Sequence, residues 1–193
     1  MALGNLIVIS GPSGAGKGTL VDFLKKERSD IALSISATTR PPRSGEQEGA
    51  SYFFLSDEDF DVLIKEDGLL EWAQVHLHRY GTPKAFVLDK INQGLQVILE
   101  IDVQGALQVR ARYPEAKLIF IEPPSLEVLE GRLRNRATEL EDAILKRLSN
   151  ARLEIEQKIE YDYVLVNDNL EKAKQELLDI VAQIARNEDK DIS

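Results

Sequence analysis

A glycine-rich segment near the N-terminus, Gly11–Thr19, limits what this chain can fold into more than any other feature. It lies between an apolar run, Leu6–Ile9, and a segment with helical periodicity, Leu20–Lys26. A buried strand, a glycine-rich turn and a helix N-terminus together direct backbone N–H groups at an anion, and Lys17 adds a full positive charge. The spacing matches a phosphate-binding P-loop as far as Lys17, whereas Gly18 stands where that pattern has Ser or Thr. The predicted phosphate-binding residues are Gly11, Pro12, Ser13, Gly14, Ala15, Gly16, Lys17, Gly18 and Thr19. The alternative interpretation, a turn that binds nothing, is disfavoured by the strand before it and the helix after it.

Short apolar runs alternate with helical patterns along most of the chain. The runs are rich in Ile, Leu and Val without regular polar alternation, which is typical of strands buried on both faces of a parallel sheet. They are Leu6–Ile9, Val97–Ile101, Leu118–Ile121 and Val164–Val166. The predicted helices are Thr19–Arg28, Asp57–Glu66, Lys84–Gln93, Gln104–Arg112, Leu126–Arg134, Leu140–Ile159 and Leu170–Arg186. This alternation predicts an α/β fold of the P-loop NTPase type, with a parallel sheet and helices on both of its faces.

Residues 36–82 interrupt the alternation. The segment Thr38–Gly45 has the composition of a loop, and Ser51–Leu55 and Leu69–Val75 have the composition of strands. The segment is too small to bury a large core of its own. We therefore expect it to form a lobe inserted into the main domain.

Composition limits the compartment and the partners. The chain has 193 residues, a formal net charge of −9 and no cysteine. The acidic balance argues against a nucleic-acid polymer as a partner, because phosphate backbones require a basic face. No apolar run approaches the roughly 20 residues of a membrane span, and no basic signal-peptide region precedes the first apolar run. We expect a cytoplasmic protein that does not bind a membrane, whereas the sequence does not predict its oligomeric state.

A second cationic site is predicted in the loop at the start of the insertion. Arg40 and Arg43 lie three residues apart, and Pro41 and Pro42 stiffen the chain between them. Both guanidinium groups can face one phosphate, which suits their forked geometry. The alternative is a pair of solvated surface arginines, and the neighbouring phosphate loop favours the first interpretation.

Eight segments in order carry a more specific resemblance. They are Gly11–Leu20, Ser36–Glu46, Leu70–Gln74, Tyr80–Gly81, Ile98–Gly105, Ile119–Ser125, Arg132–Glu139 and Tyr161–Asp168. Together they resemble guanylate kinases of the bacterial type, which are P-loop nucleoside monophosphate kinases. The resemblance implies transfer of the γ-phosphoryl group of ATP to GMP or dGMP, by direct in-line attack and with Mg²⁺ as cofactor. It also implies one domain, 1–193, divided into a core (1–35, 91–125 and 150–193), a GMP-binding lobe (36–90) and a lid (126–149).

The same resemblance assigns two groups of residues to GMP. It implies that the phosphate is held by Arg40, Arg43, Tyr52 and Tyr80, and that the guanine is bound by Ser36, Glu71, Thr82 and Asp102. Glu71 fits this role chemically, because guanine presents N1–H and N2–H₂ donors and an ionised carboxylate only accepts. Adenine instead presents an acceptor at N1, which Glu71 would repel. The alternatives are a solvated strand position for Glu71 and core or rim packing for the two tyrosines.

The resemblance places the remaining residues around ATP. It implies catalytic roles for Lys17, Arg132, Arg136 and Arg147, since arginines stabilise the charge that develops on a transferred phosphoryl group. The alternative is a solvated charge lattice with neighbouring glutamates, which we expect for Arg134. Asn167 is expected near the adenine, or as a cap of the next helix, a role open also to Asp168 and Asn169.

The chain departs from the family pattern at two further positions. Glu100 replaces the usual Asp, and Ala137 replaces a Gly in the lid. Because Gly18 cannot bind a metal through its side chain, Thr19 and Glu100 are both candidate ligands of Mg²⁺, with water between the protein and the ion.

Two other functions are compatible with such a chain. One is the guanylate-kinase-like domain of membrane-associated scaffolds, which binds phosphopeptides and generally lacks an intact P-loop. The other is a kinase of the same fold that acts on ribose 1,5-bisphosphate and has no use for a guanine-binding carboxylate. The intact P-loop argues against the first alternative, and Glu71 argues against the second.

Overall fold

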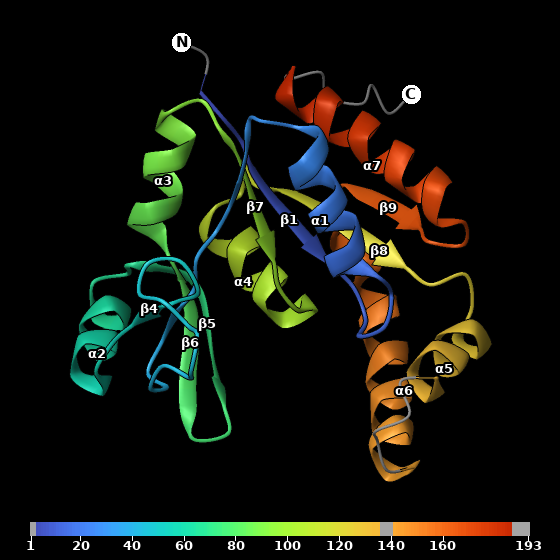
Figure 1. Cartoon of the computed structure of the whole chain (residues 1–193), viewed down its shortest axis with the longest axis horizontal. Coiled ribbons are helices and arrows are strands. Elements are labelled where there is room, and N and C mark those ends of the chain that lie inside the picture. Colours follow the sequence, from blue (N-terminus) through green and yellow to red (C-terminus); the bar gives the residue numbers. More distant parts are fainter. Residues whose placement is uncertain (1–2, 136–140, 187–193) are drawn as a thin grey trace.

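The computed structural model describes residues 3–135 and 141–186 and is organised around a parallel sheet (Figure 1). Within the described residues this sheet has five strands in the order β2-β7-β1-β8-β9. The strands are β1 (Leu6–Ser10), β2 (Ile31–Leu33), β7 (Gln96–Glu100), β8 (Lys117–Glu122) and β9 (Tyr163–Val166). The predicted parallel sheet is therefore confirmed, and β2 is an edge strand that the sequence analysis did not predict.

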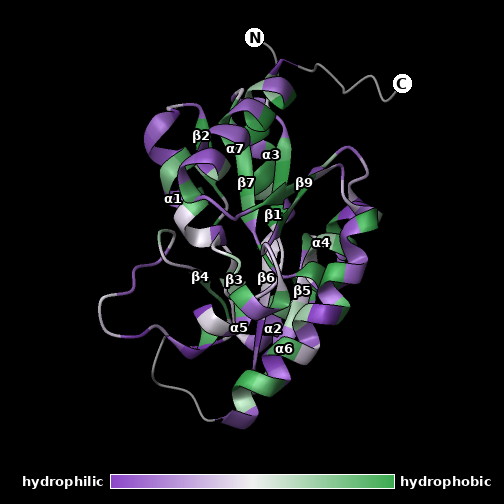
Figure 2. Cartoon of the chain, turned by 90° about the vertical axis from the view of Figure 1, so that its right-hand side faces the viewer, coloured by the Kyte–Doolittle hydropathy of each residue, from purple (hydrophilic) through white to green (hydrophobic). Residues whose placement is uncertain are grey.

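Helices cover both faces of this sheet, as predicted. On one face Ile7 and Ile9 of β1 pack with α1 (Lys17–Glu27) and α7 (Leu170–Ala185). On the other face Leu6 and Val8 pack with residues of α3 (Lys84–Asn92) and α4 (Val103–Arg112). Successive side chains of a strand point to opposite faces, so a strand with a helical layer on each side has to be apolar throughout. Figure 2 shows the resulting hydrophobic central strands, with hydrophilic residues on the outer sides of the helices.

The inserted segment forms a second, smaller sheet. Its order within the described residues is β4-β3-β6-β5. The elements are β3 (Ala37–Thr38), β4 (Phe53–Phe54), α2 (Asp57–Lys65), β5 (Leu69–Val75) and β6 (His78–Pro83). The prediction of a loop from residue 38 was wrong at its first residue, because Thr38 pairs with Tyr80 and with Phe54. The strand β6 was also not predicted.

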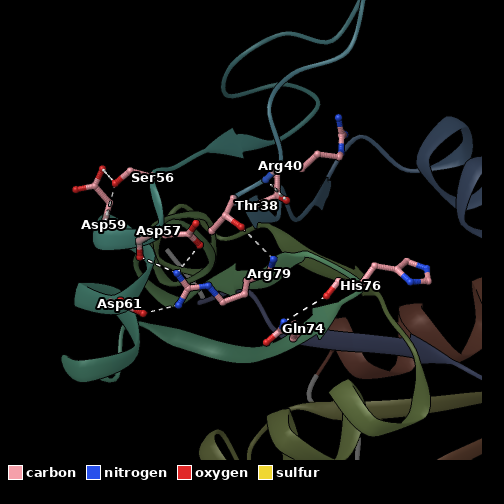
Figure 3. A network of polar contacts seen from close by, with 10 residues as sticks. Thr38, Arg40, Ser56, Asp57, Asp59, Asp61, Gln74, His76 and Arg79 are labelled. Carbon is pink, nitrogen blue, oxygen red and sulfur yellow. Dashed lines mark hydrogen bonds and ion pairs between the residues drawn. The ribbon is translucent and has the colours of Figure 1, made fainter.

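Polar contacts fix helix α2 on this sheet. Ser56 caps the helix by accepting the backbone N–H of Asp59, and its hydroxyl donates to the Asp59 carboxylate. Arg79 reaches from β6 to the first turns of α2, where it pairs with Asp57 and Asp61 (Figure 3). The Arg79 guanidinium also lies over the ring of the buried Phe60, 4.8 Å from its centroid. These contacts hold the lobe together around its own small core.

A third packing unit follows β8. Helices α5 (Leu126–Arg134) and α6 (Glu141–Glu156) share a small core of Leu129, Leu133, Ile144 and Ala151. The predicted helix 140–159 is thus divided into α6 and a 3₁₀ turn, Gln157–Glu160, and its first residue lies outside the described residues. None of the described helices has the length and apolarity that a membrane crossing requires.

Candidate active site

The glycine-rich turn between β1 and α1 has the backbone of a phosphate cradle. Gly11, Gly14 and Gly16 adopt positive φ angles of 138°, 91° and 96°. A Cβ on Gly11 would lie 2.3 Å from the carbonyl oxygen of Ile121, and one on Gly16 would lie 2.4 Å from Nδ2 of Asn167. Both the left-handed conformation and the close neighbours therefore require glycine. The first residues of α1 line a pocket, so the backbone N–H groups at the N-terminus of this helix are available to an anion.

Lys17 is held against this turn by backbone groups. Its ammonium group donates to the carbonyl oxygen of Gly11 and, at 3.1 Å, to that of Pro12. Burial lowers the pKa of Lys17, and the charge of Glu100 opposes that shift. Lys17 and Glu100 line one pocket of about 360 Å³ together with Ser13, Gly14, Gly16, Gly18 and Thr19. An amine in this position faces the same space as the α1 N-terminus, where a phosphate would bind.

A second pocket adjoins the first and contains Asn167. It measures about 210 Å³ and is lined by Gly14, Gly16, Thr19, Arg132, Asn167, Asp168 and Leu170. Asn167 is 5% exposed and donates from Nδ2 to the carbonyl oxygen of Ala15 at 2.8 Å. The backbone carbonyl oxygen of Asn167 accepts from Nη2 of Arg132 at 2.8 Å. The helix cap of α7 is Asn169, which accepts the N–H of Lys172, so a capping role for Asn167 was wrong.

The structure brings three of the four predicted phosphate ligands together in the lobe. The Arg40 guanidinium lies over the ring of Tyr52, 5.5 Å from its centroid, and the rings of Tyr52 and Tyr80 are 6.0 Å apart. Arg40 donates from Nη2 to both oxygens of Glu46, at 2.8 and 3.0 Å, and this hydrogen-bonded ion pair raises the pKa of Arg40. The fourth ligand, Arg43, has an exposed side chain, and its backbone N–H donates to Glu46 at 2.7 Å. Glu46 thus organises the loop, although nothing in its sequence spacing indicated this role.

Three of the four predicted guanine-binding residues meet where the lobe contacts the core. Glu71 of β5 is 8% exposed, and Oγ1 of Thr82 on β6 donates to its Oε1 at 2.6 Å. Burial raises the pKa of the Glu71 carboxyl, and the nearby charge of Asp102 raises it further. Asp102 caps α4 by accepting the N–H of Gly105 at 2.8 Å. Ser36 lies just before β3, and its carbonyl oxygen accepts the N–H of Phe53. The solvated strand position considered for Glu71 was therefore wrong.

The arginines after β8 have separate environments. Arg132 of α5 reaches back to the P-loop pocket through Asn167. Arg134 pairs with Glu130 and Glu141 on the surface, which confirms the expected charge lattice. Arg147 lies half-buried on α6. Arg136 and Ala137 lie outside the described residues.

The oxygen donors at the phosphate pocket suit Mg²⁺. Glu100 lies close to the start of α1, because its Oε1 is 3.6 Å from the point where a Cβ on Gly18 would lie. Carboxylate and hydroxyl oxygens, here Glu100 and Thr19, are hard ligands of the kind this ion prefers. Among the described residues there is no group of three or more His, Cys, Asp or Glu side chains that would cage a metal. A carboxylate and a hydroxyl at one pocket fit an ion that also takes ligands from phosphates and water.

The fold and the site together define a P-loop α/β protein with an inserted cation-bearing lobe, which is the class of the nucleoside monophosphate kinases. The family model described as guanylate kinase matches residues 3–184. A guanylate kinase from Caldanaerobacter subterraneus subsp. tengcongensis is 50% identical over 190 residues, which cover 96% of this chain and 92% of that protein. A guanylate kinase from Synechococcus sp. (strain JA-3-3Ab) is 53% identical over 174 residues, covering 90% of this chain and 80% of that protein. The crystal structure of guanylate kinase from Anaplasma phagocytophilum aligns with a TM-score of 0.70 at 31% identity, covering 99% of this chain and 89% of that one. The chain belongs to the guanylate kinase family, and the predicted fold class and family are confirmed.

Proposed function

We propose that this chain transfers the γ-phosphoryl group of ATP to GMP or dGMP, giving ADP and GDP or dGDP. Membership of the guanylate kinase family supports the reaction. The observation that supports GMP as the phosphoryl acceptor is the buried Glu71 carboxylate, which is hydrogen-bonded by Thr82 and lies near Asp102. This group offers acceptors to the N1–H and N2–H₂ donors of guanine.

The donor half of the reaction belongs to the P-loop. The loop Gly11–Thr19 binds the β- and γ-phosphates through the backbone N–H groups of its residues other than Pro12 and through the Lys17 ammonium. The pocket lined by Asn167 takes the adenine. An oxygen of the GMP phosphate attacks the γ-phosphorus, and the bond from that phosphorus to the bridging β-phosphate oxygen breaks. No protein nucleophile is needed. Arg132, Arg136 and Arg147 stabilise the charge on the transferred group.

The acceptor half belongs to the lobe. Arg40, Arg43, Tyr52 and Tyr80 bind the GMP phosphate, and Ser36, Glu71, Thr82 and Asp102 bind the guanine. Glu46 and Tyr52 orient the Arg40 guanidinium, so less side-chain freedom is lost when it binds a phosphate. Arg43 is exposed and completes the phosphate site when GMP binds.

When bound, Mg²⁺ would supply charge neutralisation for the transfer. Glu100 and Thr19 would hold it through water, because both line the phosphate pocket. Burial raises the pKa of the Glu100 carboxyl, and the charge of Lys17 opposes this shift. The charge of Lys17 thus favours the ionised carboxylate that a cation requires.

We also propose the division into a core, a GMP-binding lobe at 36–90 and a lid at 126–149. The separate hydrophobic clusters of the lobe and of α5–α6 support it. The proposed end of the lobe at residue 90 lies within α3, whose Val87 and Ile91 pack into the core. We place the reaction in the cytoplasm, where ATP is available, with small nucleotides rather than nucleic-acid polymers as partners.

A substrate panel tests this function. The purified protein is incubated with ATP, Mg²⁺ and one acceptor at a time, and ADP release is followed for GMP, dGMP, AMP, UMP and ribose 1,5-bisphosphate. GMP and dGMP are expected to be strongly preferred. Equal rates with GMP and AMP would contradict the guanine site, and a preference for ribose 1,5-bisphosphate would indicate the sugar kinase instead. No turnover, with retained binding of phosphopeptides, would indicate the scaffold-type module.

A further inference from the structure

The side chain of Gln108 on α4 bonds both backbone groups of a single residue in the lobe. The N–H of Trp72 donates to Oε1 of Gln108 at 3.2 Å, and Nε2 of Gln108 donates to the carbonyl oxygen of Trp72 at 3.0 Å. Trp72 lies on β5, the edge strand of the lobe sheet. An edge residue normally leaves its outward N–H and C=O without a strand partner. The Gln108 side chain satisfies both of these backbone groups of Trp72, as a neighbouring strand would.

The contact lies beside an irregular part of β5. The pairing of β5 with β6 changes register between Leu69 and Trp72, and Glu71 lies inside this interval. Such irregularities redirect a side chain and weaken the regular ladder that would otherwise fix it. Glu71 therefore has no paired residue in the β5–β6 ladder, and its neighbour Trp72 is the residue that α4 bonds.

A second residue of α4 supports the same contact. Arg112, one turn further along the helix, donates from Nη1 to the carbonyl oxygen of Leu70 at 3.4 Å and to Oε1 of Gln108 at 3.5 Å. Its charge also lowers the pKa of Glu71, against the raising effect of burial. Gln108 and Arg112 thus bond the backbone on both sides of Glu71.

The same helix also determines what Glu71 faces. Asp102 caps the start of α4, and a Cβ on Gly105 would lie 3.3 Å from Oε2 of Glu71. Glu71 belongs to the lobe, whereas Asp102 belongs to the core, so their separation depends on how β5 is held on α4. Among the described residues, Gln108 is the only one whose side chain both donates and accepts a hydrogen bond between α4 and β5.

We propose that Gln108 is a positioning residue for base recognition, which fixes Glu71 relative to Asp102 by bonding the backbone of Trp72. This inference rests on the proposed function, because it assigns guanine to these two carboxylates. Gln108 acts through the strand and does not touch the base. Its loss should therefore impair discrimination at the base more than it impairs phosphoryl transfer.

The test is the variant Gln108→Met, which keeps an unbranched side chain and removes both hydrogen bonds. The probe is selectivity between GMP and inosine monophosphate, which lacks only the 2-amino donor. We expect the KM for GMP to rise about 3- to 10-fold, the scale of a lost hydrogen bond, with little change in kcat or in the KM for ATP. The ratio of kcat/KM for GMP over inosine monophosphate should fall by a similar factor. Gln175→Met is the matched control, since among the described residues the amide of the exposed Gln175 bonds Asp179 of the same helix α7.

Two further measurements separate positioning from general destabilisation. In a Glu71→Gln background, Gln108→Met should change the selectivity ratio no further, because Gln108 acts through Glu71. If Gln108→Met does not fold, Gln108→Glu carries the same test, as it keeps the acceptor for the Trp72 N–H and loses the donor. An unchanged ratio in a folded variant would overturn the inference. Failure of the unmutated protein to phosphorylate GMP would instead overturn the proposed function.

Discussion

Lys17 combines a full charge with partial burial. Its ammonium group bonds two backbone carbonyl oxygens of the loop, and Glu100 lines the same phosphate pocket. These partners keep a cation in place where desolvation lowers its pKa. Anionic ATP phosphates would compete with the carbonyl oxygens for the same ammonium protons.

Replacing Lys17 tests this interpretation. Lys17→Ala is expected to lower kcat about 10²- to 10³-fold, the scale of removing one preorganised donor from a transition state. Steady-state kinetics with ATP and GMP measure the effect, and circular dichroism confirms the fold. Lys25→Ala, at an exposed position of the same helix, is the control and should retain full activity. Near-normal turnover of a folded Lys17→Ala protein would contradict the P-loop assignment.

Glu71 predicts how GMP binding depends on pH. Its folded pKa lies above the ordinary value of 4.5, and the proposed contact with guanine requires the ionised form. The KM for GMP should therefore rise as pH falls through this raised pKa, at a higher pH than an exposed glutamate would give. Glu71→Gln should raise the KM for GMP at neutral pH, narrow the preference over AMP and lose this part of the acid dependence. Titration of the GMP phosphate, near pH 6, is common to both proteins and is removed by the comparison.

The raised pKa of Glu71 also affects stability, and here low pH is favourable, whereas it is unfavourable for GMP binding. A carboxyl whose pKa is raised on folding favours the protonated folded state, so its ionised form destabilises the fold at neutral pH. This cost decreases as pH falls through the raised pKa and is absent below the ordinary value. Glu71→Gln also keeps an acceptor for the Thr82 hydroxyl. Thermal unfolding at neutral pH should therefore show equal or greater stability for Glu71→Gln, and a clear loss would contradict the direction of the shift.

At the scale of elements, the loop after β9 supports the P-loop. Asn167 is buried and bonds the carbonyl oxygen of Ala15, so Asn167→Ala leaves that group without its partner. We expect a loss of about 1–3 kcal/mol in the free energy of unfolding and a higher KM for ATP. Asn169→Ala removes only the cap of α7 and should cost about 1 kcal/mol without changing the KM for ATP. Denaturant unfolding measures the stability of both variants, and steady-state kinetics measure their KM for ATP. An equal KM for ATP in Asn167→Ala and Asn169→Ala would contradict the role of Asn167 in supporting the P-loop.

Elements differ in how far sequence patterns predict them. The strands β1, β7 and β8 were predicted because strands covered on both faces are apolar throughout. The edge strand β9 was predicted from its apolar run, but the expected burial on both faces was wrong, because Val164 and Val166 are exposed. The edge strand Ile31–Leu33 has three half-buried residues and gave no comparable signal. The lobe strand His78–Pro83 contains His, Arg, Gly and Pro, and it is a strand because it pairs with β3 and β5. Such pairing is a tertiary effect that no local pattern contains.

The candidate site shows the same limit. The glycines of the P-loop were predictable because their left-handed backbone and close neighbours admit no side chain. Glu46 and Gln108 were not, since each acts on a partner that the fold brings near, and their residue types are common on surfaces. Asn167 was assigned to the adenine. Its hydrogen bond to Ala15 joins the loop after β9 to the loop after β1, and this contact was visible only in the structure.

At the scale of the whole molecule, the lobe and the α5–α6 segment extend from the same end of the core sheet, at the carboxyl ends of its strands (Figure 1). Ligands of open α/β sheets bind at this end. Two nucleotides must meet there with water excluded, because ATP would otherwise be hydrolysed without an acceptor. Cations on both extensions would find phosphate partners only when the extensions approach each other. We therefore expect a more closed form with both nucleotides bound.

The contact between α4 and β5 suggests how this closure proceeds. Gln108 and Arg112 bond the backbone of β5, so this edge of the lobe should stay on the core while the opposite edge, with β3, β4 and Arg40, turns towards the P-loop. Small-angle scattering should show a smaller radius of gyration with saturating GMP plus a non-hydrolysable ATP analogue than without ligands. The variant Arg40→Met, which lacks the phosphate partner on the moving edge, should need more GMP to reach the same change. A radius unaffected by both ligands would contradict closure and leave Arg132, Arg136 and Arg147 without the contacts that their proposed role requires.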